Sequence, residues 1–534
     1  MTKIPVIDLF SGAGGLGEGF LQHPDIFDVV LSVDSNDDAV KTVTARHLFH
    51  QTNSRKVKQA YLQLLKSELS LEDFLKVGLE ERGGDNDFSI KAELGKDKYV
   101  EKDIQNVLSK SQAKDWVLVG GPPCQAYSNV GRSRNKTKAG YIPEEDGRHY
   151  LYREYLKIIR THWPSVFLME NVPGILSSRL HGELIFNKII RDLTDPIGAF
   201  ESGRGSNNCQ SNNTYKLFSV AKNAQLEQDM FGYLGGGDEK KFIVKAEDYG
   251  IPQTRHRVFI LGIRSDISTE PKALVGRPSR TTNDVLANLP RIRSGISSAD
   301  SDQAWLDLIK SSLTSDWFSE LENNAQTDLT NFIRKTVKAT KIPKNKLGSA
   351  FLEKTPKTIS KSFDAWYKTS QVGGYANHQS RFHMPSDIHR YLFASSSVML
   401  KNKKKNDSVP ESAFGNIKDF PLSLLPKHKD VIDAAKEDKL DSVKFSNRFK
   451  VQASDTAAST VVSHIANDGH YYIHYDPTQS RSLSVREAAR IQTFPDNYYF
   501  HGSTGSKYRQ IGNAVPPFLS TCIATIIADL LDRK

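Results

Sequence analysis

Residues 6–17 read VIDLFSGAGGLG, and this stretch decides the fold because it joins a short apolar strand to a helix through a glycine turn. Gly12, Gly14 and Gly17 satisfy the spacing G-x-G-x-x-G. A second apolar run follows and ends at Asp34, 22 residues after Gly12. This order is typical of a doubly wound α/β domain, in which the glycines approach a nucleoside cofactor and the acid holds its ribose. The spacing alone leaves open which nucleoside cofactor binds, or whether the turn binds none.

A second strand end carries a candidate nucleophile. Residues 116–119 (WVLV) are typical of a buried strand, and residues 120–125 (GGPPCQ) end it with two glycines and two prolines. This corner places Cys124 at the carboxyl edge of the sheet, where open α/β sheets hold their ligands. A single cysteine can otherwise be a small buried hydrophobe. We interpret Cys124 as a nucleophile because the neighbouring prolines fix the backbone around its sulfur.

Charged side chains accompany two further strands. Glu170 follows the apolar run 166–169 (VFLM), and a carboxylate there can cap a helix or act as a general acid. Arg255 and Arg257 alternate at the start of the run 258–261 (VFIL), so both point to one side of a strand. Two guanidinium groups near a carboxylate indicate a clamp for an anion or a carbonyl group.

Composition bounds the class of protein. The chain has 534 residues, of which 38% are hydrophobic and 25% charged, so it can form one large domain plus a second. Its apolar runs are shorter than the roughly 20 residues that cross a bilayer, and its first residues lack a signal-peptide pattern. Three scattered cysteines argue against a disulfide framework and against a zinc site. We therefore expect a cytoplasmic protein with no membrane segment and no metal.

The net charge of +10 matters because part of it is clustered. Arg132 and Arg134 lie in a glycine-bounded loop just after Cys124, which indicates a mobile flap over a polyanion. Residues 334–346 contain six cations and no acid. Basic residues interleaved with aromatic ones favour a nucleic-acid surface, although a solvated charged face is the alternative.

The alternation of strands and helices divides the chain into three parts. Residues 1–264 read as the main part of an α/β domain, interrupted by a helical insertion at about residues 47–98. Residues 265–446 lose this alternation and read as a smaller irregular domain. Residues 447–534 regain order, and Ser484 with Glu487 predicts a capping box at the start of a helix.

Six motifs in this order resemble those of the C5-cytosine-specific DNA methyltransferases of prokaryotic restriction-modification or defence systems. They are residues 8–15 (DLFSGAGG), 121–125 (GPPCQ), 170–172 (ENV), 253–257 (QTRHR), 486–495 (REAARIQTFP) and 512–517 (GNAVPP). The resemblance covers about residues 1–264 and 447–534. It implies a Rossmann-like methyltransferase domain with a mixed, mostly parallel sheet, and it makes residues 265–446 a target-recognition domain.

The resemblance also implies a cofactor and a role for each site residue. S-adenosyl-L-methionine, rather than NAD, would occupy the glycine turn. The residues implied to contact it are Phe10 at the adenine, Gly12, Gly14 and Gly15 in the turn, Asp34 at the ribose, Asp103 and Ile104 flanking the adenine, Pro122, and Asn513 at the methionine end. Cys124 would add to carbon 6 of a flipped cytosine, Glu170 would assist at N3, and Arg257 with Arg255 would hold the base carbonyl. The implied DNA contacts are Gln125, Arg132, Arg134, Gln253, Lys335, Lys338 and Lys341.

The implied substrate is double-stranded DNA, methylated by a monomer at the nucleoid, beside a partner nuclease or other defence proteins. Three alternatives stay open. The chain could be an RNA (tRNA) cytosine-5 methyltransferase, or a catalytically inactive DNA-binding homologue. On the glycine spacing alone, it could be a nicotinamide oxidoreductase.

Overall fold

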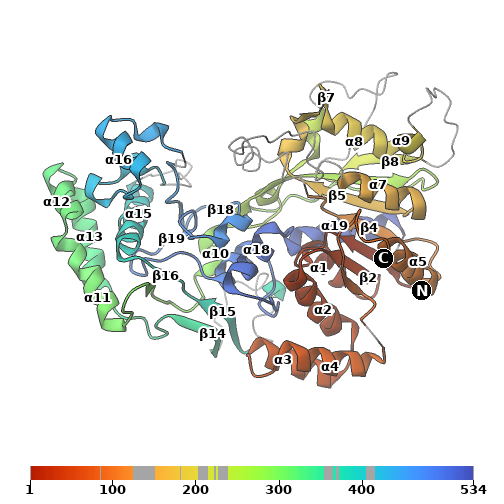
Figure 1. Cartoon of the computed structure of the whole chain (residues 1–534), viewed down its shortest axis with the longest axis horizontal. Coiled ribbons are helices and arrows are strands. Elements are labelled where there is room, and N and C mark those ends of the chain that lie inside the picture. The colour runs from red at the N-terminus through yellow and green to blue at the C-terminus, as the bar shows by residue number, and fades with distance from the viewer. Residues whose placement is uncertain are drawn as a thin grey trace.

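The computed structural model describes residues 2–84, 86–123, 151–180, 182–201, 214–221, 224–225, 238–353, 365–367, 372–404, 415–444 and 446–532. Within these ranges a nine-stranded sheet organises the larger lobe (Figure 1). Its strand order is β3 (Ser89–Lys91), β2 (Phe27–Asp34), β1 (Ile4–Leu9), β4 (Val117–Gly120), β5 (Val166–Asn171), β12 (His256–Arg264), β8 (Tyr215–Ser219) and β9 (Ala224–Gln225), and β10 (Ile243–Lys245) pairs with β12.

The strands from β3 to β5 are parallel to their neighbours, whereas β12 runs antiparallel to β5 and β8. The predicted α/β fold with a mixed sheet is therefore confirmed. Every residue of β1 and β4 is buried, as expected for central strands with both faces covered.

Helices cover both faces of this sheet (Figure 1). One face packs against α5 (Val100–Ser111), α7 (Leu151–His162) and α8 (Ile185–Thr194). The other packs against α1 (Gly15–Leu21) and α19 (Pro517–Leu530). A Cβ atom on Gly19 would lie 2.2 Å from Oγ of Ser520, so a glycine is needed for α1 and α19 to pack this closely. The chain thus returns to its first helix after more than 490 residues.

The second lobe is a helical domain rather than the irregular one expected from the sequence. Its core joins α11 (Asp302–Ser311), α12 (Asp316–Asn323), α13 (Thr327–Ala339), α15 (Pro385–Lys404) and α16 (Lys429–Lys436). The same core includes Val451 and Ile473, from β17 (Val451–Gln452) and β19 (Ile473–His474). Residues beyond the predicted boundary at 446 therefore help to close this lobe.

The insertion predicted at residues 47–98 forms two helices, α3 (Arg55–Leu65) and α4 (Leu71–Arg82), which follow α2 (Asp37–Gln51). Ser54 and Ser70 cap their first turns by accepting hydrogen bonds from Val57 N and Asp73 N. Their apolar residues form a cluster with α2 and with the hairpin of β14 (Gly348–Glu353) and β15 (Gly374–Gln379). The insertion therefore contacts both lobes (Figure 1).

The capping box predicted at Ser484 and Glu487 is present. Ser484 accepts from Glu487 N, and Glu487 accepts from Ser484 N, at the start of α17. The remaining elements are β11 (Gln253–Thr254), α10 (Thr282–Leu286), β13 (Gly295–Ile296), β16 (Phe382–His383), β18 (Ala458–Ser459), α17 (Val485–Ile491), α18 (Thr504–Asn513), the helix α9 (Gly198–Glu201), and β6 (Arg179–Leu180) with β7 (Glu183–Leu184), which form a separate pair.

One stretch of the described residues, Thr504–Leu530, has the length and apolar character of a membrane-crossing helix. Its most apolar part is 72% buried inside the protein, where α19 covers the sheet. Burial in the core accounts for its composition.

Candidate active site

The strand register gathers the predicted site residues at one edge of the sheet. Leu9 pairs with Val33 on one side and with Gly120 on the other, and Gly120 pairs with Met169. The residues that follow these four are Phe10, Asp34, Gly121 and Glu170. Because the four strands are parallel, these residues leave the sheet side by side.

Asp34 ties the glycine turn to the end of β2. Gly12 N–H donates to Asp34 Oδ2 over 2.8 Å, and Asn36 N–H donates to Asp34 Oδ1 over 2.8 Å. Burial raises the pKa of Asp34 above its usual value. Gly12 and Gly14 have φ angles of +53° and +74°, which favour glycine.

The turn fits a nucleoside cofactor. Among the described residues other than its chain neighbours, no heavy atom lies within 4 Å of a Cβ placed on Gly12, so this part of the structure leaves the backbone there open to a ligand. The carboxylate of Asp34 stands beside it, as ribose binding requires. Gly15 serves a different purpose, since a Cβ on it would lie 2.2 Å from the carbonyl oxygen of Val515. It lets residues 514–515 pack directly on the turn.

The other residues predicted to bind the cofactor occupy distinct positions. Asp103 lies half-buried in the first turn of α5, and Ile104 beside it is fully buried in the core under the sheet. Pro122 follows β4, and its carbonyl oxygen lies 3.4 Å from Nδ2 of Asn171. Asn513 is exposed at the end of α18. Their contacts with a cofactor stay predictions.

Cys124, Gln125, Arg132 and Arg134 lie outside the described residues. Before this gap the last described residues are Gly121, Pro122 and Pro123, and Gly121 lies beside the predicted acid. A Cβ placed on Gly121 would lie 2.8 Å from Glu170 Oε2. The backbone just after β4, which leads to the predicted nucleophile, therefore lies against Glu170.

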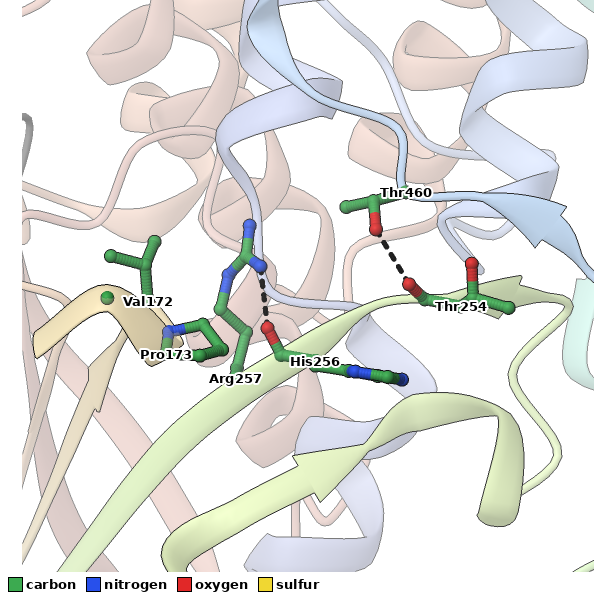
Figure 2. A pocket seen from close by; sticks show the side chains of 7 residues that line it. Val172, Pro173, Thr254, His256, Arg257 and Thr460 are labelled. Atoms are coloured by element: carbon green, nitrogen blue, oxygen red, sulfur yellow. Dashed lines mark hydrogen bonds between the residues drawn. The ribbon is translucent and has the colours of Figure 1, made fainter. Parts of the chain in front are cut away.

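Arg257 is the partner of Glu170. Arg257 Nε lies 3.1 Å from Glu170 Oε1, and both side chains are about 85% buried. Arg257 Nη1 also donates to the carbonyl oxygen of His256 over 2.7 Å (Figure 2). Burial lowers the pKa of Arg257, and the charge of Glu170 counteracts that effect. The pair holds a carboxylate in a fixed orientation at the sheet edge.

A polar pocket of about 270 Å³ opens beside this pair. Its lining residues are Val172, Pro173, Gly174, Thr254, His256, Arg257 and Thr460. Figure 2 shows Val172, Pro173 and Arg257 on one side and Thr254 with Thr460 on the other. Thr460 Oγ1 donates to the Thr254 carbonyl oxygen over 2.7 Å, which joins two segments 206 residues apart.

Two predicted site residues face inward. Arg255 is 3% exposed, and its Nη1 donates to the carbonyl oxygens of Val461 and Gly512 over 2.8 and 3.3 Å. Gln253 is fully buried, and its amide is hydrogen-bonded within the protein. A direct DNA contact by Gln253 is therefore not supported, because it exposes no atom. Arg255 likewise bonds to backbone carbonyl oxygens and does not line the pocket.

Comparison with known proteins assigns the chain to a family. The model of the C-5 cytosine-specific DNA methylases matches residues 91–196 and 229–529. The chain belongs to this family. A type II methyltransferase of Bacillus paralicheniformis is 29% identical, over 99% of each chain, and a DNA (cytosine-5-)-methyltransferase of Aeropyrum pernix is 24% identical, over the full length of both. One crystal structure is described as a candidate DNA modification methyltransferase encoded within an E. coli prophage. It matches this chain with a TM-score of 0.53 and 18% identity, over 99% of this chain and 100% of that one, and this likeness supports the fold.

As a member of the C-5 cytosine-specific DNA methylases, the chain is a transferase that acts on DNA. The family and the fold imply S-adenosyl-L-methionine as the methyl donor. This agrees with a glycine turn that is open at Gly12 and flanked by Asp34. The nicotinamide alternative is thereby excluded.

The predicted basic cluster lies far from the pocket of this methylase. Lys335 and Lys338 are exposed on α13, and Lys341 is exposed just after it. Figure 1 shows α13 in the outer layer of the second lobe, beyond α15 and distant from β18. These lysines could contact only DNA that extends well beyond the target base.

Sequence reasoning missed Asp8, the acid inside β1. Its Oδ2 accepts from Gly17 N over 3.1 Å, while Oδ1 is buried without a hydrogen-bond partner among the described residues. Burial raises the pKa of Asp8 to about 8, and the charge of Asp34 adds to the effect. A carboxyl group in an otherwise apolar strand with both faces covered was the available signal. Its bond to Gly17 supports the first turn of α1, which lacks a side-chain cap.

Proposed function

We propose that this methylase flips a cytosine out of duplex DNA and methylates its carbon 5 through a covalent bond to Cys124. The observation that carries the proposal is the contact of Glu170 with both Arg257 and Gly121, at the strand end that leads to Cys124. The polar pocket beside this contact offers room for part of an extruded nucleotide. A base stacked inside the duplex would be out of reach of Cys124, Glu170 and Arg257.

The residue types suit this chemistry. Carbon 5 of cytosine is a weak nucleophile, and a thiolate that adds at carbon 6 makes it enamine-like. A cysteine can do this near neutral pH once its thiolate is favoured. S-adenosyl-L-methionine, when bound, supplies a methyl group activated by its sulfonium. Loss of the proton from carbon 5 and elimination of the thiol then restore the aromatic ring and the free enzyme.

Glu170 and Arg257 would act on the base rather than on the methyl group. Glu170 Oε1 is taken by Arg257, so Oε2 is the oxygen that would carry the proton donated to N3 of the base. Negative charge develops on the ring as the thiolate adds, and a hydrogen bond at N3 stabilises it. Arg257 uses Nε for Glu170 and Nη1 for backbone, which leaves Nη2 for the carbonyl of the base.

The cofactor would be held by the turn and its neighbours. Asp34 would accept from the ribose hydroxyls while it holds Gly12, and Phe10 would lie against the adenine. Asp103, Ile104, Pro122, Gly14, Gly15 and Asn513 complete the proposed contacts. Arg132 and Arg134, with Gln125, would close over the flipped base.

We also propose that residues 265–446 contain the target-recognition part and that the chain modifies host DNA as one half of a restriction-modification system. Its relatives include type II methyltransferases, which supports this role. In this setting the enzyme would act as a cytoplasmic monomer on the nucleoid, with a partner nuclease of the same specificity. Lys335, Lys338 and Lys341 would contact the backbone of flanking DNA.

The test compares the chain with its Cys124→Ala variant in a host that lacks cytosine methylation. Bisulfite sequencing of host DNA should show methylation at one short sequence with the unmodified chain and none with the variant. The purified variant should still bind duplex DNA. Methylation by Cys124→Ala would refute the assignment of the nucleophile. Parallel incubation with tRNA and a tritiated methyl donor distinguishes the RNA alternative, and unmethylated DNA with the unmodified chain would favour the inactive homologue.

A further inference from the structure

A buried polar network runs between the pocket and the glycine turn. Gln253, in β11, stands at its centre and is fully buried. Its Oε1 accepts from Val461 N over 3.1 Å. Its Nε2 donates to Gln492 Oε1 over 2.5 Å and to the carbonyl oxygen of Ile491 over 3.1 Å. One side chain thus connects three segments that are distant in the sequence.

The network reaches the glycine turn through Gln492. This side chain is fully buried, and its Nε2 donates to the carbonyl oxygen of Ala514. Residues 514–515 pack on Gly15 so closely that a Cβ there would lie 3.1 Å from Cβ of Ala514 and 2.2 Å from the Val515 carbonyl oxygen. Any change in the position of the turn therefore acts on Ala514.

The network reaches the pocket through the neighbours of its members. Thr254 follows Gln253, Thr460 precedes Val461, and both threonines line the pocket. The two segments are paired in parallel, with Thr254 opposite Ser459. A displacement of Val461 by its bonds to the network would therefore change the wall formed by Thr460.

Arg255 adds a second connection between the same two ends. Its Nη1 donates both to the Val461 carbonyl oxygen and to that of Gly512, which precedes Asn513 at the proposed cofactor site. Burial and the nearby Arg257 lower the pKa of Arg255. A cation in this position is expensive to retain unless its bonds are kept, so Gly512 and Val461 are held at a fixed separation.

We propose that Gln253, Gln492 and Arg255 are positioning residues that couple cofactor binding at the glycine turn to binding of the flipped base in the pocket. The inference rests on the proposed function. Hydrogen-bonded side chains in a dry interior cannot move singly without leaving a partner unsatisfied. The two sites therefore favour matched arrangements, and each ligand should increase the affinity for the other by the same factor.

The test measures that factor by calorimetry. The dissociation constant of S-adenosylhomocysteine is determined for the full-length protein alone and with saturating duplex that carries the target sequence. Duplex affinity is then measured with and without S-adenosylhomocysteine. We expect the unmodified protein to show a coupling factor of about 5–150, equal in both directions. In Gln492→Leu the factor should fall to within about twofold of unity.

Gln510→Leu is the matched control. Gln510 is also a buried glutamine with three hydrogen-bond partners, Thr42 Oγ1, the His501 carbonyl oxygen and Ser506 Oγ, and it stands outside the network. It should keep the coupling factor of the unmodified protein even if it lowers the melting temperature. Arg255→Lys, which keeps the charge but replaces the forked guanidinium by one ammonium nitrogen, provides a second network variant if Gln492→Leu does not fold, and it should lose most of the coupling.

Two outcomes would overturn the inference. One is an unmodified protein in which each ligand binds independently of the other, and the second is a pair of network variants that keep the full coupling factor. Failure of the proposed function is distinct from both. It would appear as an unmodified protein that binds neither S-adenosylhomocysteine nor DNA.

Discussion

Substitution of Gly121 by alanine should impair catalysis without unfolding the protein. The added Cβ would stand 2.8 Å from Glu170 Oε2, whereas an ordinary contact begins at 3.4 Å. The carboxylate must therefore retreat by about half an ångström. It cannot do so freely, because Arg257 holds Oε1 at 3.1 Å and is itself bonded to backbone. Gly121 has a φ outside the left-handed region, so alanine is compatible with the backbone.

The expected loss follows from this displacement. A misplacement of 1 Å in a reacting group costs up to about 100-fold in rate, so half that displacement should cost about 10-fold. A 10-fold loss corresponds to about 1.4 kcal/mol of transition-state stabilisation. The assay is single-turnover transfer of a tritiated methyl group to unmethylated plasmid DNA with saturating enzyme and cofactor.

Gly276→Ala is the control for this prediction. Gly276 is exposed, and the nearest atom to a Cβ there lies at 3.7 Å, so its variant should react at the unmodified rate. Both variants should melt within a few degrees of the unmodified protein. A Gly121→Ala enzyme with an unchanged single-turnover rate would show that the position of Glu170 against β4 does not limit the reaction.

Three further predictions concern buried carboxylates. Asp496→Ala removes the carboxylate that pairs with Arg490, and both side chains are fully buried with contacts of 2.6 and 2.9 Å. The free energy of unfolding in denaturant should therefore fall by about 3–5 kcal/mol, and a fall below about 1 kcal/mol would contradict this. Asp34→Ala removes the acceptor of Gly12 N–H, so calorimetry should show S-adenosylhomocysteine binding weakened by about 10-fold to 100-fold. A variant that binds S-adenosylhomocysteine as tightly as the unmodified protein would refute this. Asp8 has a pKa of about 8 in the folded protein against 3.8 unfolded, so folding takes up a proton in between, and this contribution to stability is lost as pH rises toward 8. Asp8→Asn lacks that titration, so its stability relative to the unmodified protein should increase between pH 5 and 8 by up to about 1.4 kcal/mol per pH unit, whereas parallel stability curves would exclude the raised pKa.

The parts of the site that the sequence predicted are those set by local pattern. Asp34, Gly121 and Glu170 follow apolar runs, and the parallel register brings such residues to one edge whatever the rest of the chain does. Arg257 was also predicted from local pattern, because it lies at the start of an apolar run, and in the structure that run forms β12, which pairs with the strand that carries Glu170.

The parts that were wrong depend on partners far along the chain. Gln253 looked like a surface contact, yet its partners lie 208 and 238 residues away at Val461 and Ile491. A polar side chain gives no local sign that it will be buried among such partners. The boundary of the second lobe was also missed, because part of its core comes from β17 and β19, beyond the segment that holds its helices.

The position of α19 has a consequence for synthesis on the ribosome. This helix and α1 together cover one face of the central sheet, so the cover over Val6, Val29 and their neighbours is incomplete until residues 517–530 emerge. At about 5–20 residues per second, a chain of 534 residues needs roughly half a minute to two minutes. During that time the nascent protein exposes apolar strand residues that can aggregate. Expression in slow, cool cultures or with extra chaperone should therefore raise the yield of active enzyme more than a stabilising surface substitution would.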